Sequence, residues 1–217
     1  MPVAGIRGCG SSKAALFLSL FQGKEMPGKF SRPGALTHLP SYESATDELN
    51  VIIETPKGSR NKYNYDEEYQ LFKLGGVLPA GAVFPFDFGF IPSTIGGDRD
   101  PLDVLLLMDE AAFPGCLVRA RLIAVIEAEQ TERNGETTRN DRLIAVAADS
   151  HTHKELRSLA DINETLLDEI EHFFVSYNEI KGKNFNPLGR YGHIKAARLV
   201  EEGRKNFLQS NRGGKET

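Results

Sequence analysis

The chain lacks several features that define special classes of protein. It has no tryptophan and two cysteines, Cys9 and Cys116, among its 217 residues. Two cysteines cannot build a disulfide framework or a cysteine-based zinc site. No apolar run approaches the roughly 18 residues that a membrane-spanning helix requires. We therefore expect neither a disulfide-stapled fold nor a membrane protein.

The chain also lacks an excess of positive charge. Lysine and arginine total 26 and aspartate and glutamate total 30, which gives a formal net charge of −4. Nucleic-acid-binding proteins carry a basic patch or stripe, so we expect no nucleic-acid partner. The 40% hydrophobic and 26% charged residues are ordinary for a soluble globular protein. The 21 glycines and 11 prolines indicate many tight turns, which favours a β-rich architecture.

Three regions are predicted along the chain. We expect residues 1–47 to be an N-terminal arm that is partly irregular, residues 48–208 to be one folded domain, and residues 209–217 to be a flexible tail. The apolar run at residues 14–21 follows basic residues, as in a secretory signal. No small-residue cleavage site follows it, so a frayed tail or short accessory helix is the favoured interpretation. Met26 is an alternative start of the protein.

Short β-rich segments precede any helical pattern. The expected strands cover residues 49–54, 62–65, 71–78, 82–91, 104–108, 117–129 and 143–148. Apolar residues at helical spacing from Leu166 to Tyr177 predict a helix that begins near Asp161 and ends at Gly182. A second helix is expected over residues 193–208. Strands followed by two helices predict an α+β fold, with a small closed β-barrel and helices packed outside it.

Two of the expected strands carry patterns that predict their burial. A phenylalanine recurs at every second position from Phe84 to Phe90, so we expect the four rings to share one face and form a core. Residues 104–108 are continuously apolar, which indicates a strand buried on both faces. Further along, Asn134-Gly135 predicts a hairpin turn before the strand at residues 143–148.

The acidic chemistry of the chain is concentrated in residues 97–103, Gly-Asp-Arg-Asp-Pro-Leu-Asp. Asp98 and Asp100 are two residues apart, so an extended backbone places both on one side, and a turn at Pro101 can bring Asp103 to the same side. Clustered carboxylates repel one another unless a cation compensates them, and hard oxygen ligands suit Mg²⁺, Mn²⁺ or Ca²⁺. The alternative is an acidic surface turn. The apolar strand that follows favours a rigidly anchored metal site.

Other motifs lie in a fixed order around this segment. Glu54 ends a β-branched strand, Lys62-Tyr63 follows it, and an aromatic and proline-rich stretch at residues 84–92 precedes the acidic turn. Tyr177 lies near the end of the expected helix, before Lys181-Gly182-Lys183. With Asp-x-Asp-Pro-x-Asp at its centre, this order resembles the soluble family I inorganic pyrophosphatases over roughly residues 48–205.

The resemblance implies a five-stranded barrel of OB type with flanking C-terminal helices, which binds several Mg²⁺ ions and hydrolyses pyrophosphate to two phosphates. It implies that Asp100 accepts a proton from the attacking water. The implied catalytic residues are Asp100, Lys62 and Tyr177. The implied substrate-binding residues are Lys62, Arg142, Tyr177 and Lys183. The implied metal ligands are Asp98, Asp103, Glu54, Asp100 and Asp141, for Mg²⁺ or alternatively Mn²⁺.

Several positions depart from the family pattern. Residues that lack the usual charge or hydroxyl group stand at Asn64, Gly76, Phe88 and Asn178. Lys73 is near enough to Gly76 in sequence to replace a missing phosphate-binding arginine. Arg99, within the acidic motif, places a cation where a small or polar residue is usual. We expect a complete first metal site and a depleted phosphate cradle.

The second acidic hairpin departs further. The family has Asp-x-Lys before an apolar strand, and here Asn140-Asp141-Arg142 stands in its place. Arg142 is a workable phosphate binder, whereas Asn140 offers only a neutral carbonyl oxygen. Asp141 would serve as the ligand only if the strand were locally bulged. The other hairpin carboxylate falls near Gln130, with neighbouring glutamates at positions 129 and 132 as candidates.

We therefore expect a Mg²⁺-dependent inorganic pyrophosphatase that acts in the cytoplasm as a homo-oligomer. The alternative is a catalytically weakened relative that binds phosphate or nucleotide and acts by binding or assembly. The acidic motif with Lys62 and Tyr177 favours the enzyme, and the altered outer positions favour the alternative.

Residues 1–25 lack helix caps and sustained periodicity, so we predict that they are dispensable. A protein that begins at Met26 should keep the solubility, melting temperature and activity of the full chain. Thermal unfolding of both proteins checks this. A fall of many degrees in the melting temperature would show instead that the apolar run at residues 16–21 packs on the body or on a partner subunit.

Overall fold

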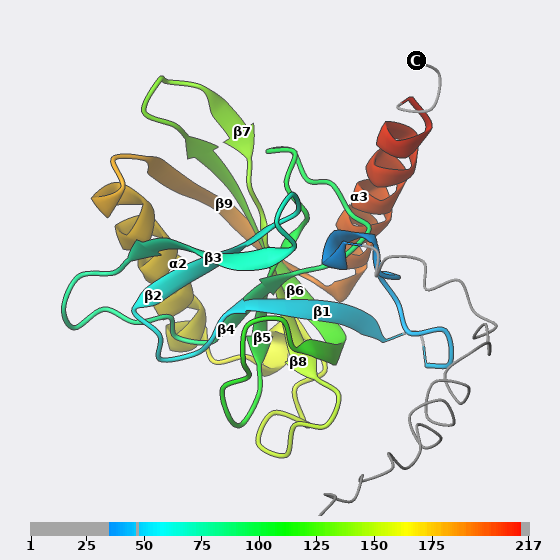
Figure 1. Ribbon diagram of the computed structural model, residues 1–217. Helices are drawn as coiled ribbons and strands as arrows, with labels where there is room; N and C mark the ends of the chain where they lie inside the picture. The colour runs from blue at the N-terminus through cyan, green and yellow to red at the C-terminus, as the bar shows by residue number, and fades with distance from the viewer. Residues whose placement is uncertain (1–34, 47, 214–217) are drawn as a thin grey trace, which may run out of the picture. The chain divides into compact units, whose positions relative to one another are not determined.

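The structure, a computed structural model, describes residues 35–46 and 48–213 (Figure 1). The apolar run at residues 14–21, the alternative start at Met26 and most of the expected N-terminal arm lie outside these residues, as do the last four residues of the expected tail. No helix of the described part is long and apolar enough to cross a membrane.

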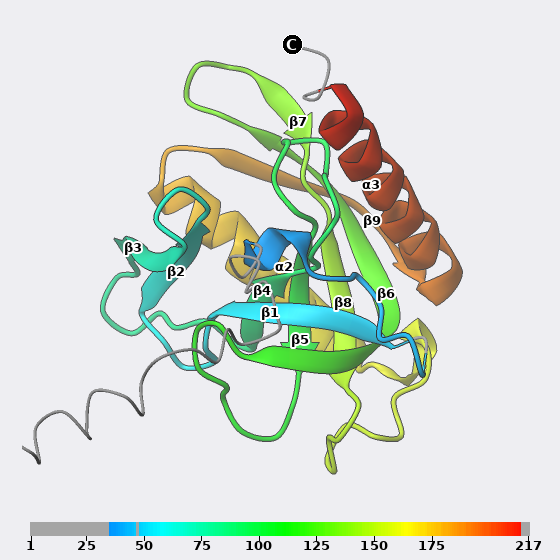
Figure 2. The same ribbon diagram turned by 45° about the vertical axis from the view of Figure 1, so that its right-hand side comes forward.

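Five strands pair into a ring. They are β1 (Leu49–Thr55), β4 (Asp87–Phe90), β5 (Asp103–Leu107), β8 (Arg142–Ala147) and β6 (Leu117–Thr131). The pairing runs in that order, and β6 pairs back with β1 through Leu49↔Ala120 to Ile52↔Leu117. The ring strands lie side by side in Figure 2. The β5–β8 pair is parallel and the other pairs of the ring are antiparallel. The chain thus has the expected α+β fold with a ring of five strands.

Four shorter or peripheral strands extend this frame. β7 (Thr137–Arg139) and β9 (Asn184–Gly192) both pair with β6. β2 (Asn61–Asp66) and β3 (Leu71–Val77) form a separate two-stranded hairpin beside the ring. The predicted turn at Asn134-Gly135 is confirmed, with Gly135 at φ 84° between β6 and β7.

The central strands are buried on both faces, as the apolar run at residues 104–108 predicts. Leu105 and Leu107 of β5 pack with one core cluster, and Val104 and Leu106 pack with another. The residues of β8 alternate in the same way. Ile144 and Val146 pack with the first cluster, and the second cluster contains Leu143, Ala145 and Ala147. A strand without a solvent face has no polar alternation, which explains its continuous apolar sequence.

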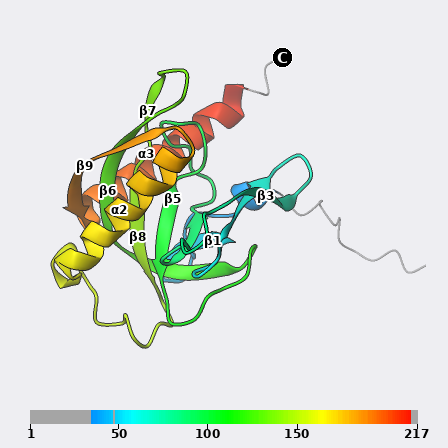
Figure 3. The ribbon, with the colours of Figure 1, turned by 90° about the vertical axis from the view of Figure 1, so that its left-hand side faces the viewer.

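Two helices cover the strands. α2 (Glu164–Ile180) buries Leu167, Ile170 and Phe174 in the first cluster, and Figure 3 shows it lying across β5, β8 and β6. Its N-cap is Asn163, whose side chain accepts a hydrogen bond from the Thr165 amide at 2.8 Å. α3 (His193–Gly213) packs against β6 and β9.

The boundaries of the helices correct the sequence prediction at two points and agree with it at one. Asp161 does not start the long helix, because it ends the 3-10 turn η3 (Leu159–Asp161) and forms a capping box with Ser158. Gly182, at φ 70°, follows the C-cap of α2 as expected. α3 continues to Gly213, five residues past the predicted end at Leu208.

Three strands also differ from the prediction. The expected strand at residues 82–91 is reduced to β4, because Pro85 cannot donate to a ladder. Phe84, Phe86 and Phe88 enter the first cluster, and Phe90, two residues after Phe88 in β4, lies against Tyr65. The other two differences are β7 and β9, neither of which the sequence analysis predicted.

Gly89 of β4 allows the ring to close between β4 and β1. A Cβ atom at this position would overlap the carbonyl oxygen of Ile52. Gly89→Ala should therefore force β1 away from β4 and cost about 1–3 kcal/mol, the usual range for overpacking. Gly76→Ala is the matched strand control, because nothing lies within 4 Å of a Cβ there. Urea unfolding of both variants checks the prediction, and equal midpoints would contradict it.

Candidate active site

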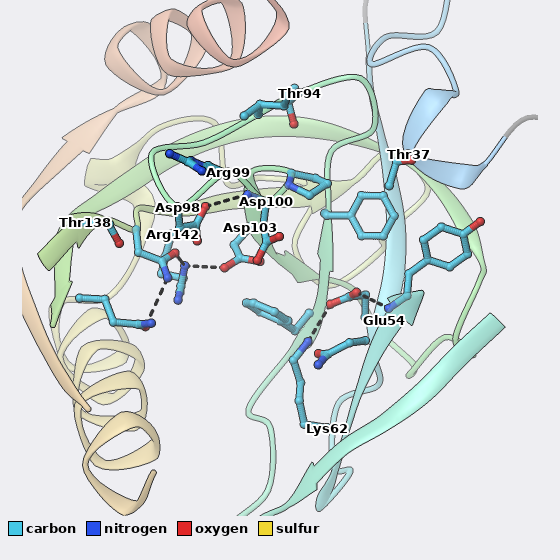
Figure 4. A pocket seen from close by; sticks show the side chains of 18 of the residues that line it. Thr37, Glu54, Lys62, Thr94, Asp98, Arg99, Asp100, Asp103, Thr138 and Arg142 are labelled. Carbon is cyan, nitrogen blue, oxygen red and sulfur yellow. Dashed lines mark hydrogen bonds and ion pairs between the residues drawn. The ribbon is translucent and has the colours of Figure 1, made fainter. Parts of the chain in front are cut away.

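A pocket of about 830 Å³ lies where the acidic turn, β1, β2, β8 and the end of α2 meet (Figure 4). Its wall on one side carries the carboxylates of Asp98, Asp100 and Asp103. The lining also includes the cations Lys62, Arg99, Arg142, Lys181 and Lys183. The sequence-predicted carboxylates and phosphate-binding residues are thus brought together, with the exception of Asp141.

The acidic turn is held by its own hydrogen bonds. The Gly96 amide donates to the Asp100 carbonyl oxygen at 2.8 Å, and the Asp100 amide donates to Asp98 Oδ1 at 3.2 Å. Thr94 Oγ1 accepts from the Leu102 amide at 3.0 Å and anchors the far side of the turn. The carboxylates therefore project from a folded turn at the start of β5, as the apolar strand after them predicts.

Burial and mutual repulsion act on these carboxylates. The pKa of Asp98 is raised to about 6, first by burial and then by the charge of Asp103. The pKa of Asp100 is raised by the same two causes in the same order, against the lowering effects of Lys183 and Lys62. Both groups thus lie in a field that opposes their ionisation until a cation compensates them.

Arg142 lies at the base of the pocket and is almost fully buried. Its Nη1 donates to Asp103 Oδ2 at 2.5 Å and also to the side-chain oxygen of Asn140. Its Cζ lies 4.9 Å from the ring centre of Phe174 and 5.2 Å from that of Phe185. The buried guanidinium therefore contacts a carboxylate and two aromatic rings in place of solvent water.

On the opposite wall, Glu54 and Lys62 form an ion pair of 2.7 Å. The Tyr65 amide also donates to Glu54 Oε1, at 2.8 Å. Burial raises the pKa of Glu54, and Lys62 opposes that rise. The Lys62 Nζ lies 4.5 Å from the ring centre of Phe88. Phe88, which has no hydroxyl group, therefore contacts the lysine only through the face of its ring.

The end of α2 supplies the remaining cationic side. Tyr177 accepts a hydrogen bond from Lys181, and burial raises the pKa of the Tyr177 phenol to about 12. Burial, together with the nearby charges of Lys62 and Lys183, lowers the pKa of Lys181 to about 8. Lys183 pairs with Glu132 at 2.8 Å. Lys181 also lines the pocket, although the sequence resemblance implies a substrate-binding role only for its neighbour Lys183.

Asp141 is the predicted ligand that the structure does not bring to the pocket. Its Oδ1 accepts from the Ala128 amide at 2.9 Å and from Arg139 at 2.8 Å, on the β6–β7 side. Asn140 lines the pocket instead. The Asn140 side-chain amide donates to Gln130 Oε1 at 3.3 Å. Two neutral side chains therefore face each other at the positions where the sequence resemblance implies carboxylates.

Two other altered positions contribute no charge to the pocket. Lys73 does not replace a missing arginine, because it pairs with Asp66 at 2.6 Å and is not part of the pocket lining. Asn178 is buried and donates to the Phe174 carbonyl oxygen at 2.9 Å. Neither Lys73 nor Asn178 therefore adds a cation to the pocket lining.

Sequence reasoning missed the residues at the mouth of the pocket. Thr37 and His38 line it, although they belong to the expected arm. The Ser93 amide donates to the Thr37 carbonyl oxygen at 2.6 Å, and the His38 ring lies edge-on to Phe207 of α3 at 5.0 Å. No residue pattern marks this contact, because it joins two distant segments through single side chains.

The carboxylate wall has the chemistry of a magnesium site. Asp98, Asp100 and Asp103 offer hard oxygen donors. The raised pKa of Asp98 and of Asp100 reflects burial and charge repulsion that a divalent cation would offset. Within the described residues, no three ligating side chains are gathered around one point. Mg²⁺ does not need such a cage, because it usually keeps several waters and takes one or two carboxylates together with substrate phosphates.

Comparisons with known proteins agree with this chemistry. The family described as inorganic pyrophosphatase matches residues 51–208. The inorganic pyrophosphatase of Synechocystis is 37% identical over 172 residues, which cover 79% of this chain and 98% of that protein. The inorganic pyrophosphatase of Methanosarcina acetivorans is 34% identical over 163 residues, which cover 75% of this chain and 94% of that protein. The crystal structure of the Thermus thermophilus enzyme has a TM-score of 0.73 at 32% identity and covers 80% of this chain and 99% of that one. The chain therefore belongs to the inorganic pyrophosphatase family.

Proposed function

We propose that this chain catalyses the Mg²⁺-dependent hydrolysis of inorganic pyrophosphate to two phosphates. The observation that carries the proposal is one pocket whose lining combines the three carboxylates of the acidic turn with lysines, arginines and a tyrosine. Pyrophosphate is strongly anionic, and its transfer to water demands positioned positive charge on both phosphates. The opposed walls meet this demand.

In this proposal the cationic side holds the substrate. Lys62, Tyr177 and Lys183 bind phosphate oxygens, and Lys181 adds a further donor beside them. Arg142 sits deeper and is already bound to Asp103, so it positions that carboxylate and adds charge to the floor of the cradle. These groups are donors held in place before the substrate enters, and so they need little reorganisation during the reaction.

The carboxylate side holds the metal and moves the proton. Asp98 and Asp103 serve as Mg²⁺ ligands, with Glu54 in the surrounding network. When bound, Mg²⁺ supplies charge neutralisation and lowers the pKa of water. Asp100 accepts the proton of the attacking water. Its raised pKa suits that role, because a general base works best when its pKa lies near the working pH.

We extend the proposal to the context of the enzyme. The five-stranded ring corresponds to an OB-type barrel, and residues 48–208 form the catalytic domain. The protein acts in the cytoplasm as a homo-oligomer, with Mg²⁺ as the main metal and Mn²⁺ as an alternative. Nothing in the pocket or among the relatives favours the alternative of a binding or assembly protein.

The direct test is phosphate release from pyrophosphate at millimolar Mg²⁺, with and without a chelator. We expect release that the chelator abolishes and that added Mg²⁺ restores. Absence of release above a blank would rule out the proposed hydrolysis.

Asp100→Asn keeps the shape of the side chain but removes the proton acceptor. We predict that turnover falls by roughly 10²–10⁴-fold, the range typical of losing a general base, while pyrophosphate binding survives. Steady-state kinetics and equilibrium binding of the variant check the two parts separately. Turnover near that of the wild type would show that another group takes the proton.

Asn140→Asp adds a carboxylate at the pocket lining. We predict a lower Mg²⁺ concentration at half-maximal activity, because attraction between a carboxylate and a divalent ion at near contact is several kcal/mol even at an effective dielectric of roughly 20. Mn²⁺ should support more activity than Mg²⁺ at equal concentration in the wild type.

A metal titration of both proteins at fixed free pyrophosphate measures this effect. Asp141→Asn is the matched control, because Asp141 is held by Arg139 outside the pocket and its loss should leave the Mg²⁺ dependence unchanged. Superimposable curves for Asn140→Asp and the wild type, with a shifted curve for Asp141→Asn, would make Asp141 the ligand.

A further inference from the structure

Arg99 adopts a backbone conformation that its residue type disfavours. It has φ 73°, and within the described residues Gln70 and Ser93 are the other non-glycine residues with positive φ. A side chain with a Cβ is strained in this left-handed region, where glycine is at ease. Such outliers persist when the surrounding structure fixes them, and they cluster at functional sites.

The acidic turn supplies that fixing structure. The Arg99 amide donates to the Gly96 carbonyl oxygen at 3.3 Å, within a turn that the Gly96 amide and the Asp100 carbonyl oxygen close. On the outside, a Cβ at Gly97 would lie 2.9 Å from the Arg139 carbonyl oxygen, so the turn is pressed against the end of β7. The backbone at Arg99 therefore cannot relax without opening the turn.

The side chain of Arg99 has no partner among the residues that the structure describes. Lys62, Arg142 and Lys183, which line the same pocket, each pair with a carboxylate, and Lys181 donates to Tyr177. Arg99 also lines the pocket, yet its guanidinium makes no hydrogen bond, ion pair or ring contact in this part of the chain. In Figure 4 it lies beside Asp98, and no dashed line reaches it.

Among the described residues, the contacts of the adjacent carboxylates do not include Arg99. Asp98 Oδ1 accepts from the Asp100 amide at 3.2 Å, and Asp103 pairs with Arg142 at 2.5 Å. Arg99 is exposed, so its five N–H donors and its full positive charge face solvent at the lining of a pocket for a highly anionic molecule.

We propose that Arg99 is a substrate-binding residue that engages a phosphate group of pyrophosphate. The inference rests on the proposed function and adds a ligand from the acidic wall, where the resemblance places only carboxylates. A guanidinium binds phosphate through two parallel hydrogen bonds. Arg99 thereby offsets part of the positive charge missing at Gly76 and Asn178.

The test compares Arg99→Gly with Gln70→Gly in the full chain. Gln70, at φ 53°, lies in the turn between β2 and β3 and does not line the pocket, so its replacement reports relief of backbone strain alone. Binding is measured with imidodiphosphate, a non-hydrolysable pyrophosphate analogue, in the presence of MgCl₂. Steady-state kinetics with pyrophosphate supply KM and kcat.

We expect Arg99→Gly to weaken imidodiphosphate binding about tenfold, the loss of one charge-assisted contact. KM should rise by a similar factor while kcat changes by less than about twofold. Arg99→Lys keeps the charge but not the fork, and its effect should be intermediate. Gln70→Gly should change neither constant. Both glycine variants should melt about 2–4 °C higher, because each removes a strained left-handed residue.

Unchanged binding and KM in Arg99→Gly would overturn the inference. So would an unchanged KM with a lower half-saturating Mg²⁺ concentration, because Arg99 would then act only by repelling the metal. If the wild type releases no phosphate, the proposed hydrolysis fails instead, and imidodiphosphate binding to Arg99→Gly still decides whether the arginine holds a phosphate.

Discussion

The ion pair between the buried Arg142 and the partly buried Asp103 is the interaction on which the pocket depends. The two residues begin β8 and β5, which pair in parallel from Val104↔Leu143 onward, so the charges face each other across the same end of the sheet. Removing one partner of such a pair leaves an uncompensated buried charge, which is far more costly than the net worth of the pair. The pair therefore ties the acidic turn to the floor of the pocket.

The same pair divides the charges of the pocket into two functions. Asp103 pairs with Arg142, whereas burial and the charge of Asp103 raise the pKa of Asp98 and Asp100. Lys62 and Lys183 pair with Glu54 and Glu132. Among the described residues, Asp98 and Asp100 thus have no ion-pair partner, which leaves their charge for a bound cation to balance.

Much of this arrangement could be predicted from local sequence. The apolar run after Asp103 predicted a strand buried on both faces, and the helical stripe before Gly182 predicted α2, because each pattern follows directly from the period of its element. The sequence also predicts that Asp98, Asp100 and Asp103 lie close together, because a short turn leaves few ways to separate them. Lys62 and Tyr177 were placed in the pocket only through the family resemblance, since nothing in their local pattern fixes their position.

The failures have equally specific causes. β9 contains Pro187 and two glycines and shows no alternation, yet its pairing with β6 tolerates the proline at a register shift between Glu127 and Ala128. Asp141 was assigned to the pocket, but in extended chain neighbouring side chains point to opposite sides, so a register difference of one residue exchanges it with Asn140. The position of β9 and the side to which Asp141 points both depend on pairing between strands that are distant in sequence. The local sequence of one segment does not determine that pairing.

The lining of the pocket extends beyond the range that the family model matches. Thr37 and His38 precede that range, and Ser210 and Asn211 follow it, yet all four line the same pocket as the acidic turn. A chain cut at the limits of residues 51–208 would therefore lose part of the pocket wall while keeping all three carboxylates of the turn.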